Sequence, residues 1–272
     1  MMSTAFALIT DNLYLRRAEQ TIHELRTRGN WSGTVVLATI GFDLSDEFKS
    51  KYNVTEVKFE PIDKTGLLKK IGPHGFQNSD KRELHKLNQW EKFHMFDEYF
   101  TQWQRIVFLD AGLRVLDTVE HLLELDCKGK ILAPNDAAPY FHPDKIFRNQ
   151  LDHANPELIE QVTADFGDNI LESQYFLNCI WIYDTDILKI CSKKQMIDAM
   201  NIYPVCRTNE MTIMNLLLHF KYGLWQEFPI KTQSGDKYLF EWNESNHPFP
   251  TNWMDYCYMK YPSTNPPFIS IE

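Results

Sequence analysis

The first 60 residues alternate between short apolar runs and amphipathic segments, and this alternation limits the fold more than any other feature. Residues 5–9 are apolar throughout, and apolar residues at helical spacing follow them as far as Arg28. Residues 34–39 form a β-branched run without polar alternation, which is typical of a strand buried on both faces. A helical pattern over 46–52 and an alternating run over 54–59 come next. Strand, helix, strand, helix, strand predicts a parallel sheet.

An apolar run in the middle of the chain ends in an acid. Residues 81–99 carry Leu, Trp and Phe at helical spacing, and the run 105–109 then leads directly to Asp110. Ligands of open α/β sheets bind outside the carboxyl ends of the strands, so Asp110 is placed for chemistry. The alternative is an aspartate that only caps the turn after its strand, and the pattern alone leaves both readings open.

The rest of the chain continues the α/β pattern. We expect strands over 113–116, 130–134, 175–183 and 222–228, helical segments over 119–123, 156–166 and 209–220, and loops over 61–80, 135–155 and 232–250. The sequence contains no repeats, low-complexity tracts or linkers. We therefore predict a single domain over residues 1–272, with a mainly parallel central sheet flanked by helices.

Composition argues against several classes of function. The chain of 272 residues is 43% hydrophobic with a formal net charge of -9, so it can build a core but lacks the basic face that nucleic-acid binding needs. Its five cysteines are scattered without a C-x-x-C pair, which argues against a zinc site or a disulfide framework. No run approaches the roughly 20 apolar residues of a membrane span, and the N-terminus lacks the pattern of a signal peptide. We expect a cytoplasmic protein with no nucleic-acid partner, and a homodimer stays open.

Four separated motifs occur in a fixed order along the chain. They are ALITDNLY at 7–14, LHKLNQW at 84–90 followed by VFLDAG at 107–112, FLNC at 176–179, and NEM at 209–211. This order resembles the glycogenin-like glycosyltransferases, family 8 of the retaining enzymes, which have a GT-A (Rossmann-like) domain. The helix that precedes the acidic strand is the most specific of the matches.

The resemblance implies a function. It implies transfer of a hexosyl or N-acetylhexosaminyl group from a nucleotide sugar, a UDP-sugar, to a glycan or glycoprotein acceptor with retention, and Mn²⁺ or Mg²⁺ as the cofactor. It places the nucleotide-sugar-binding part in about 1–135 and the acceptor side in about 136–272. The alternative is a non-catalytic nucleotide- or sugar-binding descendant of the fold. A nucleotidyltransferase would share the sheet, but residues 10–17 lack the glycines of a phosphate loop.

The resemblance also assigns roles to individual residues. Asp110, Asn178 and Glu210 are expected at the reacting sugar. The donor is expected to contact Thr10, Asn12, Tyr14, Lys86, Ala111 and Gly112. The metal is expected on Asp110 and His247, with Asp117 or water completing its oxygen-rich shell.

Each role has a structural alternative. Lys86 would face solvent, Asn178 would be satisfied by backbone, and Glu210 would only meet a helix N-terminus. His247 would be an exposed structural histidine. Aromatic residues in the loop 135–155 are candidates for stacking on the acceptor sugar or for a satellite of the core: Tyr140, Phe141 and His142.

The chain departs from the family pattern at the metal. The Asp-x-Asp motif reads Asp110-Ala111-Gly112, so the second carboxylate is missing. The closing His-x-x-Gly-x-x-Lys pattern is not found either: Asn246-His247-Pro248 or Lys260-Tyr261-Pro262 could stand near its place, but neither matches it. The first departure removes one expected metal ligand, so the use of a metal stays open.

Overall fold

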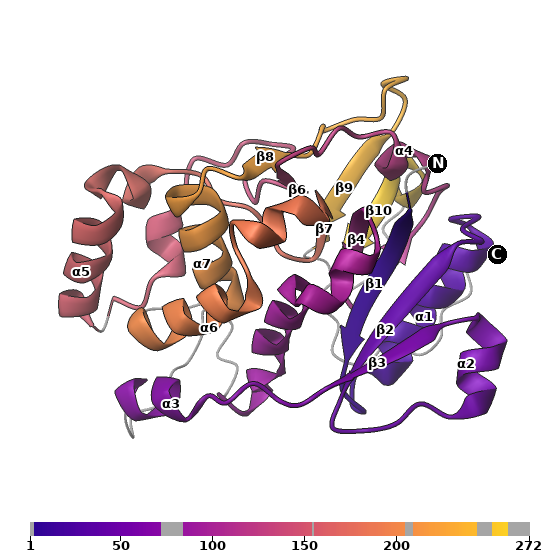
Figure 1. Ribbon diagram of the computed structural model, residues 1–272. Helices are drawn as coiled ribbons and strands as arrows, with labels where there is room; N and C mark the ends of the chain where they lie inside the picture. Colours follow the sequence, from indigo (N-terminus) through magenta and orange to yellow (C-terminus); the bar gives the residue numbers. More distant parts are fainter. Residues whose placement is uncertain (1–2, 72–83, 154, 205–208, 244–251, 261–272) are drawn as a thin grey trace.

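The computed structural model describes residues 3–71, 84–153, 155–204, 209–243 and 252–260 of the chain, and the side chains of 71 and 84–87 lie outside the described part. The strands of the central sheet are β1 (Thr4–Thr10), β2 (Thr34–Ile40), β3 (Thr55–Phe59), β4 (Arg105–Leu109), β6 (Ile131–Ala133), β7 (Ile180–Asp184) and β8 (Trp225–Glu227) (Figure 1). They lie in the order β3-β2-β1-β4-β7-β6-β8. Only β7 runs antiparallel to its neighbours among these strands. The predicted mainly parallel central sheet is confirmed.

A smaller sheet lies beside the turn that follows β4. Its strands are β5 (Leu113–Val115), β9 (Tyr238–Trp242) and β10 (Tyr256–Lys260), in the order β5-β10-β9. β10 pairs antiparallel with β5, so Lys260 lies opposite Leu113. This register brings the end of β10 to the segment that directly follows Asp110.

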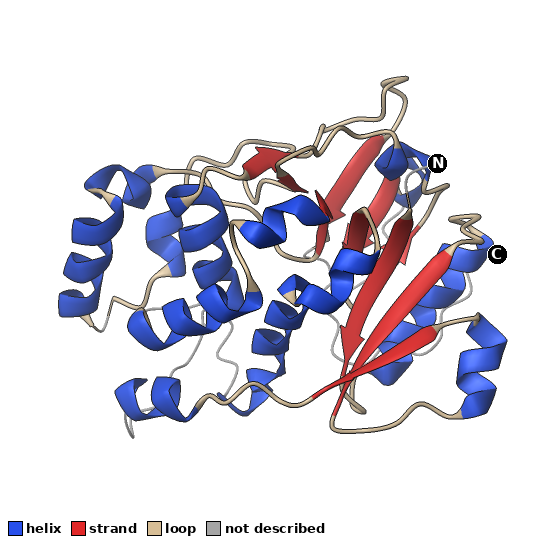
Figure 2. Ribbon diagram, viewed as in Figure 1, coloured by secondary structure: helices blue, strands red, loops and turns tan. Residues whose placement is uncertain are grey.

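Helices flank the central sheet on both sides (Figure 2). The α-helices are α1 (Leu15–Thr27), α2 (Asp46–Tyr52), α3 (Thr65–Ile71), α4 (Glu120–Leu123), α5 (Pro156–Phe166), α6 (Lys193–Ile202) and α7 (Glu210–Met214). The 3₁₀ helices are η1 (Leu84–Phe96), η2 (Glu98–Gln102), η3 (Phe147–Gln150), η4 (Asp168–Glu172), η5 (Thr185–Lys189) and η7 (Trp253–Asp255), and η6 (Asn215–Lys221) is a π-helix. Figure 1 shows α5, α6 and α7 grouped together, away from α1 and α2 beside β1–β3. Within the described residues, no helix is long and apolar enough to cross a membrane.

Local sequence explains where several helices begin and end. The Ser45 hydroxyl accepts a hydrogen bond from the Phe48 amide at 3.1 Å and starts α2, and Asn53 ends it in the left-handed region at φ 49°. Pro156 occupies the first turn of α5, where its missing amide proton costs nothing. Ser192 and Gln195 form a capping box at the start of α6.

One apolar cluster joins the two sheets. It contains Leu8 and Trp181 from the central sheet together with Leu239 and Tyr258 from the smaller one, all 2% exposed or less. The residues of β1, β2 and β4 are buried almost throughout, as their continuous apolar runs predict. The carboxyl ends of β1 and β4 are therefore fixed in position by the packed core.

Three elements differ from the sequence-based expectation. The segment 61–80 was expected as a loop with at most one helical turn, but α3 occupies seven of its residues. The polar loop expected over 232–250 contains β9, and β10 was not expected at all. β10 pairs with β9 and with β5, which lies far away in sequence, so local periodicity gives little sign of these strands.

The strand expected over 175–183 is shorter than its apolar run. β7 begins at Ile180, opposite Leu109, the last residue of β4. Asn178 therefore lies in the segment before the strand and not inside it. Outside the strand, the Asn178 side chain can reach α7, where it contacts Glu210.

Candidate functional site

The site begins at the carboxyl end of β4. Asp110 follows Leu109, the last residue of that strand, and its amide donates to the Cys179 carbonyl at 2.8 Å. The antiparallel register of β4 and β7 therefore places Asn178 beside Asp110. Two of the residues predicted to act on the sugar share one end of the sheet.

Lys92 in η1 connects all three predicted catalytic residues. Its ammonium nitrogen lies 3.5 Å from Asp110 Oδ1 and 3.1 Å from Glu210 Oε1, and it donates to the Asn178 carbonyl oxygen at 3.3 Å. The Lys92 side chain is only 8% exposed. A buried ammonium with three oxygen partners is satisfied, so Lys92 works as an internal tie between η1, the end of β4 and α7.

Glu210 is held at the first position of α7. The residue before it, Asn209, takes φ 57°, a conformation uncommon outside glycine, and donates to Gln89 Oε1 at 2.5 Å. The Asn178 amide donates to Glu210 Oε1 at 2.6 Å, whereas Glu210 Oε2 is buried without a hydrogen-bond partner among the described residues. Because buried carboxylate oxygens almost always accept a hydrogen bond, Glu210 Oε2 is placed to accept one from a ligand or a water molecule.

A second lysine approaches Asp110 from the smaller sheet. Lys260 Nζ lies 2.8 Å from Asp110 Oδ2 and donates to the Ala111 carbonyl oxygen at 2.8 Å, and its side chain is 8% exposed. Asp110 itself is 21% exposed at its side chain. The carboxylate therefore stands at the boundary of the protein with an ammonium group on each oxygen.

Arg17 in α1 adds a third positive charge. A Cβ atom built on Gly112 would stand 3.4 Å from Arg17 Nε, so the guanidinium lies against the turn after Asp110. Its Cζ lies 5.5 Å from the centre of the Tyr14 ring. Arg17 Nε and Nη2 are buried without hydrogen-bond partners among the described residues.

The charges shift the pKa values of these groups. Burial raises the pKa of Asp110, but Lys260 and Lys92 outweigh burial and lower that pKa to about 2. Burial also lowers the pKa of Lys92, and the Asp110 and Glu210 carboxylates more than reverse it. Burial raises the pKa of Glu210 and lowers that of Lys260, and their partners offset only part of each shift. At neutral pH Asp110 is ionised.

The loop after β1 borders the same end of the sheet, since β1 pairs with β4. Thr10 is buried and donates to the Asp11 carbonyl oxygen at 2.8 Å, and the Tyr14 amide donates to Asp11 Oδ1 at 2.8 Å. Asn12 is exposed at the tip of this turn. The predicted nucleoside residues Thr10, Asn12 and Tyr14 thus form one short turn, with Arg17 leading from it to Gly112.

Two predicted site residues lie outside what the structure describes. His247 belongs to an undescribed segment, and the side chain of Lys86 is undescribed although its backbone lies in η1. Their roles stay predictions.

Conversely, sequence reasoning missed Lys92 and Arg17, and it noted Lys260 only as standing near the place of the closing motif, with no role assigned to it. Lys92 stands between Glu91 and Phe93 on a helix with a buried apolar face, and a lysine in such a setting is a signal for a buried partner.

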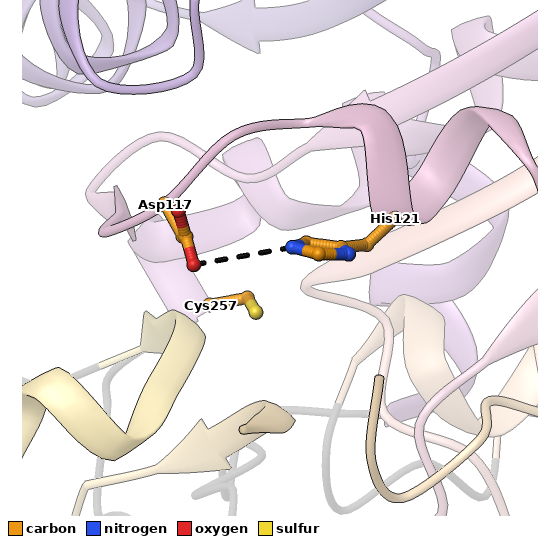
Figure 3. Close-up of side chains that lie close together, drawn as sticks. All are labelled: Asp117, His121 and Cys257. Carbon is orange, nitrogen blue, oxygen red and sulfur yellow. Dashed lines mark ion pairs between the residues drawn. The ribbon is translucent and has the colours of Figure 1, made fainter. Parts of the chain in front are cut away.

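Asp117, a second metal-ligand candidate, belongs to a different cluster (Figure 3). Its carboxylate lies with His121 of α4 and Cys257 of β10, and one ligand atom from each falls within 4.8 Å of the others. It is the one such group of three among the described residues, and Asp110 is not part of it. Lys237 Nζ lies 2.5 Å from Asp117 Oδ2 and already neutralises the carboxylate. Burial and the Asp117 charge raise the pKa of Cys257 to about 12, so its thiol is not a ready ligand.

Exposed aromatic side chains lie in the loop expected to face the acceptor. Tyr140 is 63% exposed and Phe141 52% exposed. The Tyr140 hydroxyl lies 3.4 Å from that of Tyr256 in β10, which stacks on Tyr238 in β9. The loop therefore meets the small sheet that also carries Lys260.

The seven-stranded sheet, the helices around it and the acid at the end of β4 define a GT-A glycosyltransferase fold. An active-site mutant of LgtC shares this fold at TM-score 0.62 and 11% identity, over 95% of this chain and 87% of that one. The apo bifunctional glycosyltransferase WbbM is similar at TM-score 0.57 and 10% identity, over 96% of this chain and 46% of its own. The glycosyltransferase GlyE from Streptococcus pneumoniae is similar at TM-score 0.51 and 13% identity, over 84% of this chain and 45% of its own.

This chain thus spans less than half the length of WbbM and GlyE and most of LgtC. No family profile and no curated protein sequence matches it. At these identities the similarity establishes the fold.

Proposed function

We propose that this protein is a glycosyltransferase that moves a sugar from a UDP-sugar to a carbohydrate or protein-linked acceptor. The observation that carries the proposal is the contact of Asp110, Asn178 and Glu210 through Lys92 at the carboxyl end of β4. Three residues predicted from separate motifs meet within one hydrogen-bonded network, at the place where α/β sheets bind their ligands. The fold shared with known glycosyltransferases supports the same class of reaction.

The reaction breaks the bond between C1 of the donor sugar and the diphosphate oxygen, and forms a bond between C1 and an acceptor oxygen. The acceptor hydroxyl proton passes to the leaving diphosphate, which balances the step. Positive charge develops at C1 as the first bond breaks. The Glu210 carboxylate, whose Oε2 has no hydrogen-bond partner among the described residues, would face that charge, and Asn178 would hold a sugar hydroxyl. Transfer with retention of the anomeric configuration is part of this proposal.

The nucleoside would lie on the turn formed by Thr10, Asn12 and Tyr14. An aromatic ring and backbone groups suit a uracil base, and the side chain of Lys86 would face the phosphates. The acceptor would approach over Tyr140 and Phe141, whose exposed rings suit the apolar face of a sugar. A hexosyl or N-acetylhexosaminyl donor fits this arrangement.

Release of UDP from UDP-glucose, UDP-galactose and UDP-N-acetylglucosamine tests the proposal. The wild type should release UDP from at least one donor, and Glu210→Gln should slow that release by about 10²–10³-fold, the usual cost of one well-placed electrostatic group. Glu91→Gln is the matched control. Glu91 is also a buried glutamate with a lysine partner, but it pairs with Lys64 and His94 and not with Lys92. Equal rates in the wild type and Glu210→Gln would contradict the proposed role, and no release from any donor would contradict the function.

A further inference from the structure

The diphosphate of a nucleotide sugar needs a positive partner as it leaves, and GT-A folds commonly supply a divalent cation. The described residues around Asp110 do not fit such an ion. Hard divalent cations take several oxygen ligands, and these include at least one carboxylate that is free to face the ion. Here the two oxygens of the Asp110 carboxylate face Lys92 at 3.5 Å and Lys260 at 2.8 Å, and the nearby Glu210 carboxylate also pairs with Lys92, at 3.1 Å. A cation beside Asp110 would be repelled by two ammonium groups at close range.

The backbone also disfavours a second carboxylate at the usual motif position. Gly112 has φ +88°, a left-handed conformation that residues with a Cβ rarely adopt. A Cβ there would stand in van der Waals contact with Arg17 Nε, at 3.4 Å. The turn is therefore built around glycine and arginine where an aspartate would be needed to complete a metal site.

We propose that the ammonium group of Lys260 takes the place of the metal ion and, together with Arg17, binds the diphosphate of the nucleotide donor. This inference rests on the proposed function, because the diphosphate belongs to the donor. The Lys260 ammonium lies 2.8 Å from both Asp110 Oδ2 and the Ala111 carbonyl oxygen, so it already occupies the place beside the carboxylate where a cation would bind.

Lys260 and Arg17 have donors left for a ligand. A lysine ammonium has three N–H donors, and Lys260 uses two of them in the described structure. Arg17 Nε and Nη2 are buried and make no hydrogen bond to a described residue. Lys92, by contrast, directs its ammonium to three protein oxygens and serves the fold.

The charges of this network favour an anion. Three cations, Arg17, Lys92 and Lys260, meet the two carboxylates of Asp110 and Glu210, which leaves one positive charge in excess. A diphosphate would bring negative charge to a partly buried place where Coulomb interactions are stronger than in water. The fixed ammonium and guanidinium groups would supply what a metal supplies elsewhere.

Titration calorimetry with UDP tests the inference on the wild type. UDP should bind with nearly the same affinity in buffer with EDTA and in buffer with Mn²⁺, within about twofold. Loss of UDP binding in EDTA would overturn the inference and support the Mn²⁺ or Mg²⁺ expected from the family resemblance. Absence of UDP binding in both buffers would instead contradict the proposed function.

Variants at Lys260 test which group replaces the ion. Lys260→Met, which keeps the length and removes the charge, should weaken UDP binding about 10- to 100-fold in EDTA, as expected for a lost charge-assisted contact. Lys260→Arg should retain most of the affinity. Lys237→Met is the matched control, because Lys237 also pairs with an aspartate next to the small sheet but lies in the Asp117 cluster. Lys237→Met should bind UDP like the wild type.

Unchanged affinity in Lys260→Met would overturn the assignment. The melting temperature of each variant is measured first, because Lys260 is buried. If Lys260→Met does not fold, Arg17→Met is measured in its place: weaker UDP binding in EDTA supports the inference, and unchanged binding overturns it.

Discussion

The Asp110 carboxylate pairs with the buried ammonium groups of Lys92 and Lys260. It therefore contributes to the stability of the fold as well as to the proposed site. Asp110→Asn removes the charge that compensates Lys92 and Lys260, whose side chains are each 8% exposed. Breaking such a pair costs about 2–3 kcal/mol of unfolding free energy when one partner is partly exposed. The rate of UDP release should also fall by about 10²–10³-fold, because Lys260 loses the group that positions it. Urea titration and the release assay measure the two effects.

Asp184→Asn is the control for this prediction. Asp184 pairs with Arg105 at 2.8 Å and is 12% exposed, but it lies at the opposite end of the same strand pair. It should lose comparable stability and keep the rate of UDP release per folded molecule. A slow but fully stable Asp110→Asn variant would show that the carboxylate does not compensate the two lysines.

At the scale of residues, the sequence predicts Asp110, Asn178 and Glu210 as candidates, and the structure brings them together through Lys92. Lys260 could not be predicted in the same way. It meets Ala111 across 149 positions of the chain, through a strand that has no strong local pattern. The position of Lys260 next to Asp110 can be inferred only once the pairing of β10 with β5 is known.

At the scale of elements, a buried ion pair ties α1 to the smaller sheet. Arg114 in β5 is fully buried, and its Nε lies 2.9 Å from Glu24 Oε1 in α1 while the Val115 amide donates to Glu24 Oε2 at 3.0 Å. Arg114→Met should lower the unfolding free energy by about 3–5 kcal/mol, because Glu24 then stays buried as an uncompensated charge. Urea denaturation measures the loss.

The double variant Glu24→Leu with Arg114→Met separates charge from packing. It should recover a large part of the loss, since two apolar side chains can replace a buried ion pair at little cost. Lys194→Ala at the exposed pair with Asp198 is the control and should change stability by less than about 0.5 kcal/mol. A double variant that is less stable than Arg114→Met would mean that packing, not charge, dominates at this contact.

Elements with strong local patterns could be predicted, and those that depend on distant partners could not. β1, β2 and β4 are continuous apolar runs in the core. Each end of these strands lies within one residue of its expected position. β9 and β10 consist of five residues each and exist because they pair with each other and with β5. β7 begins opposite the last residue of β4, and no pattern within 175–183 reveals this starting position.

At the scale of the whole molecule, one apolar cluster spans both sheets, and this favours the predicted single domain. Four of the described cysteines lie in different parts of the structure and can serve as probes of unfolding: Cys127 before β6, Cys179 before β7, Cys191 before α6 and Cys257 in β10. All four are buried, and burial raises the pKa of each to about 12. In the folded protein these thiols are therefore protonated and shielded at pH 8.

We predict that these four thiols become reactive together as urea unfolds the protein. Labelling with iodoacetamide at increasing urea, followed by peptide mass spectrometry, measures a separate midpoint for each cysteine. In a single cooperative unit the four midpoints coincide with the loss of helical circular dichroism, because each thiol is exposed only by global unfolding. UDP at saturating concentration should shift all four midpoints to higher urea by the same amount. Labelling of Cys257 at clearly lower urea than Cys179 would show that the smaller sheet opens separately from the central one, and the prediction of one domain would then be wrong.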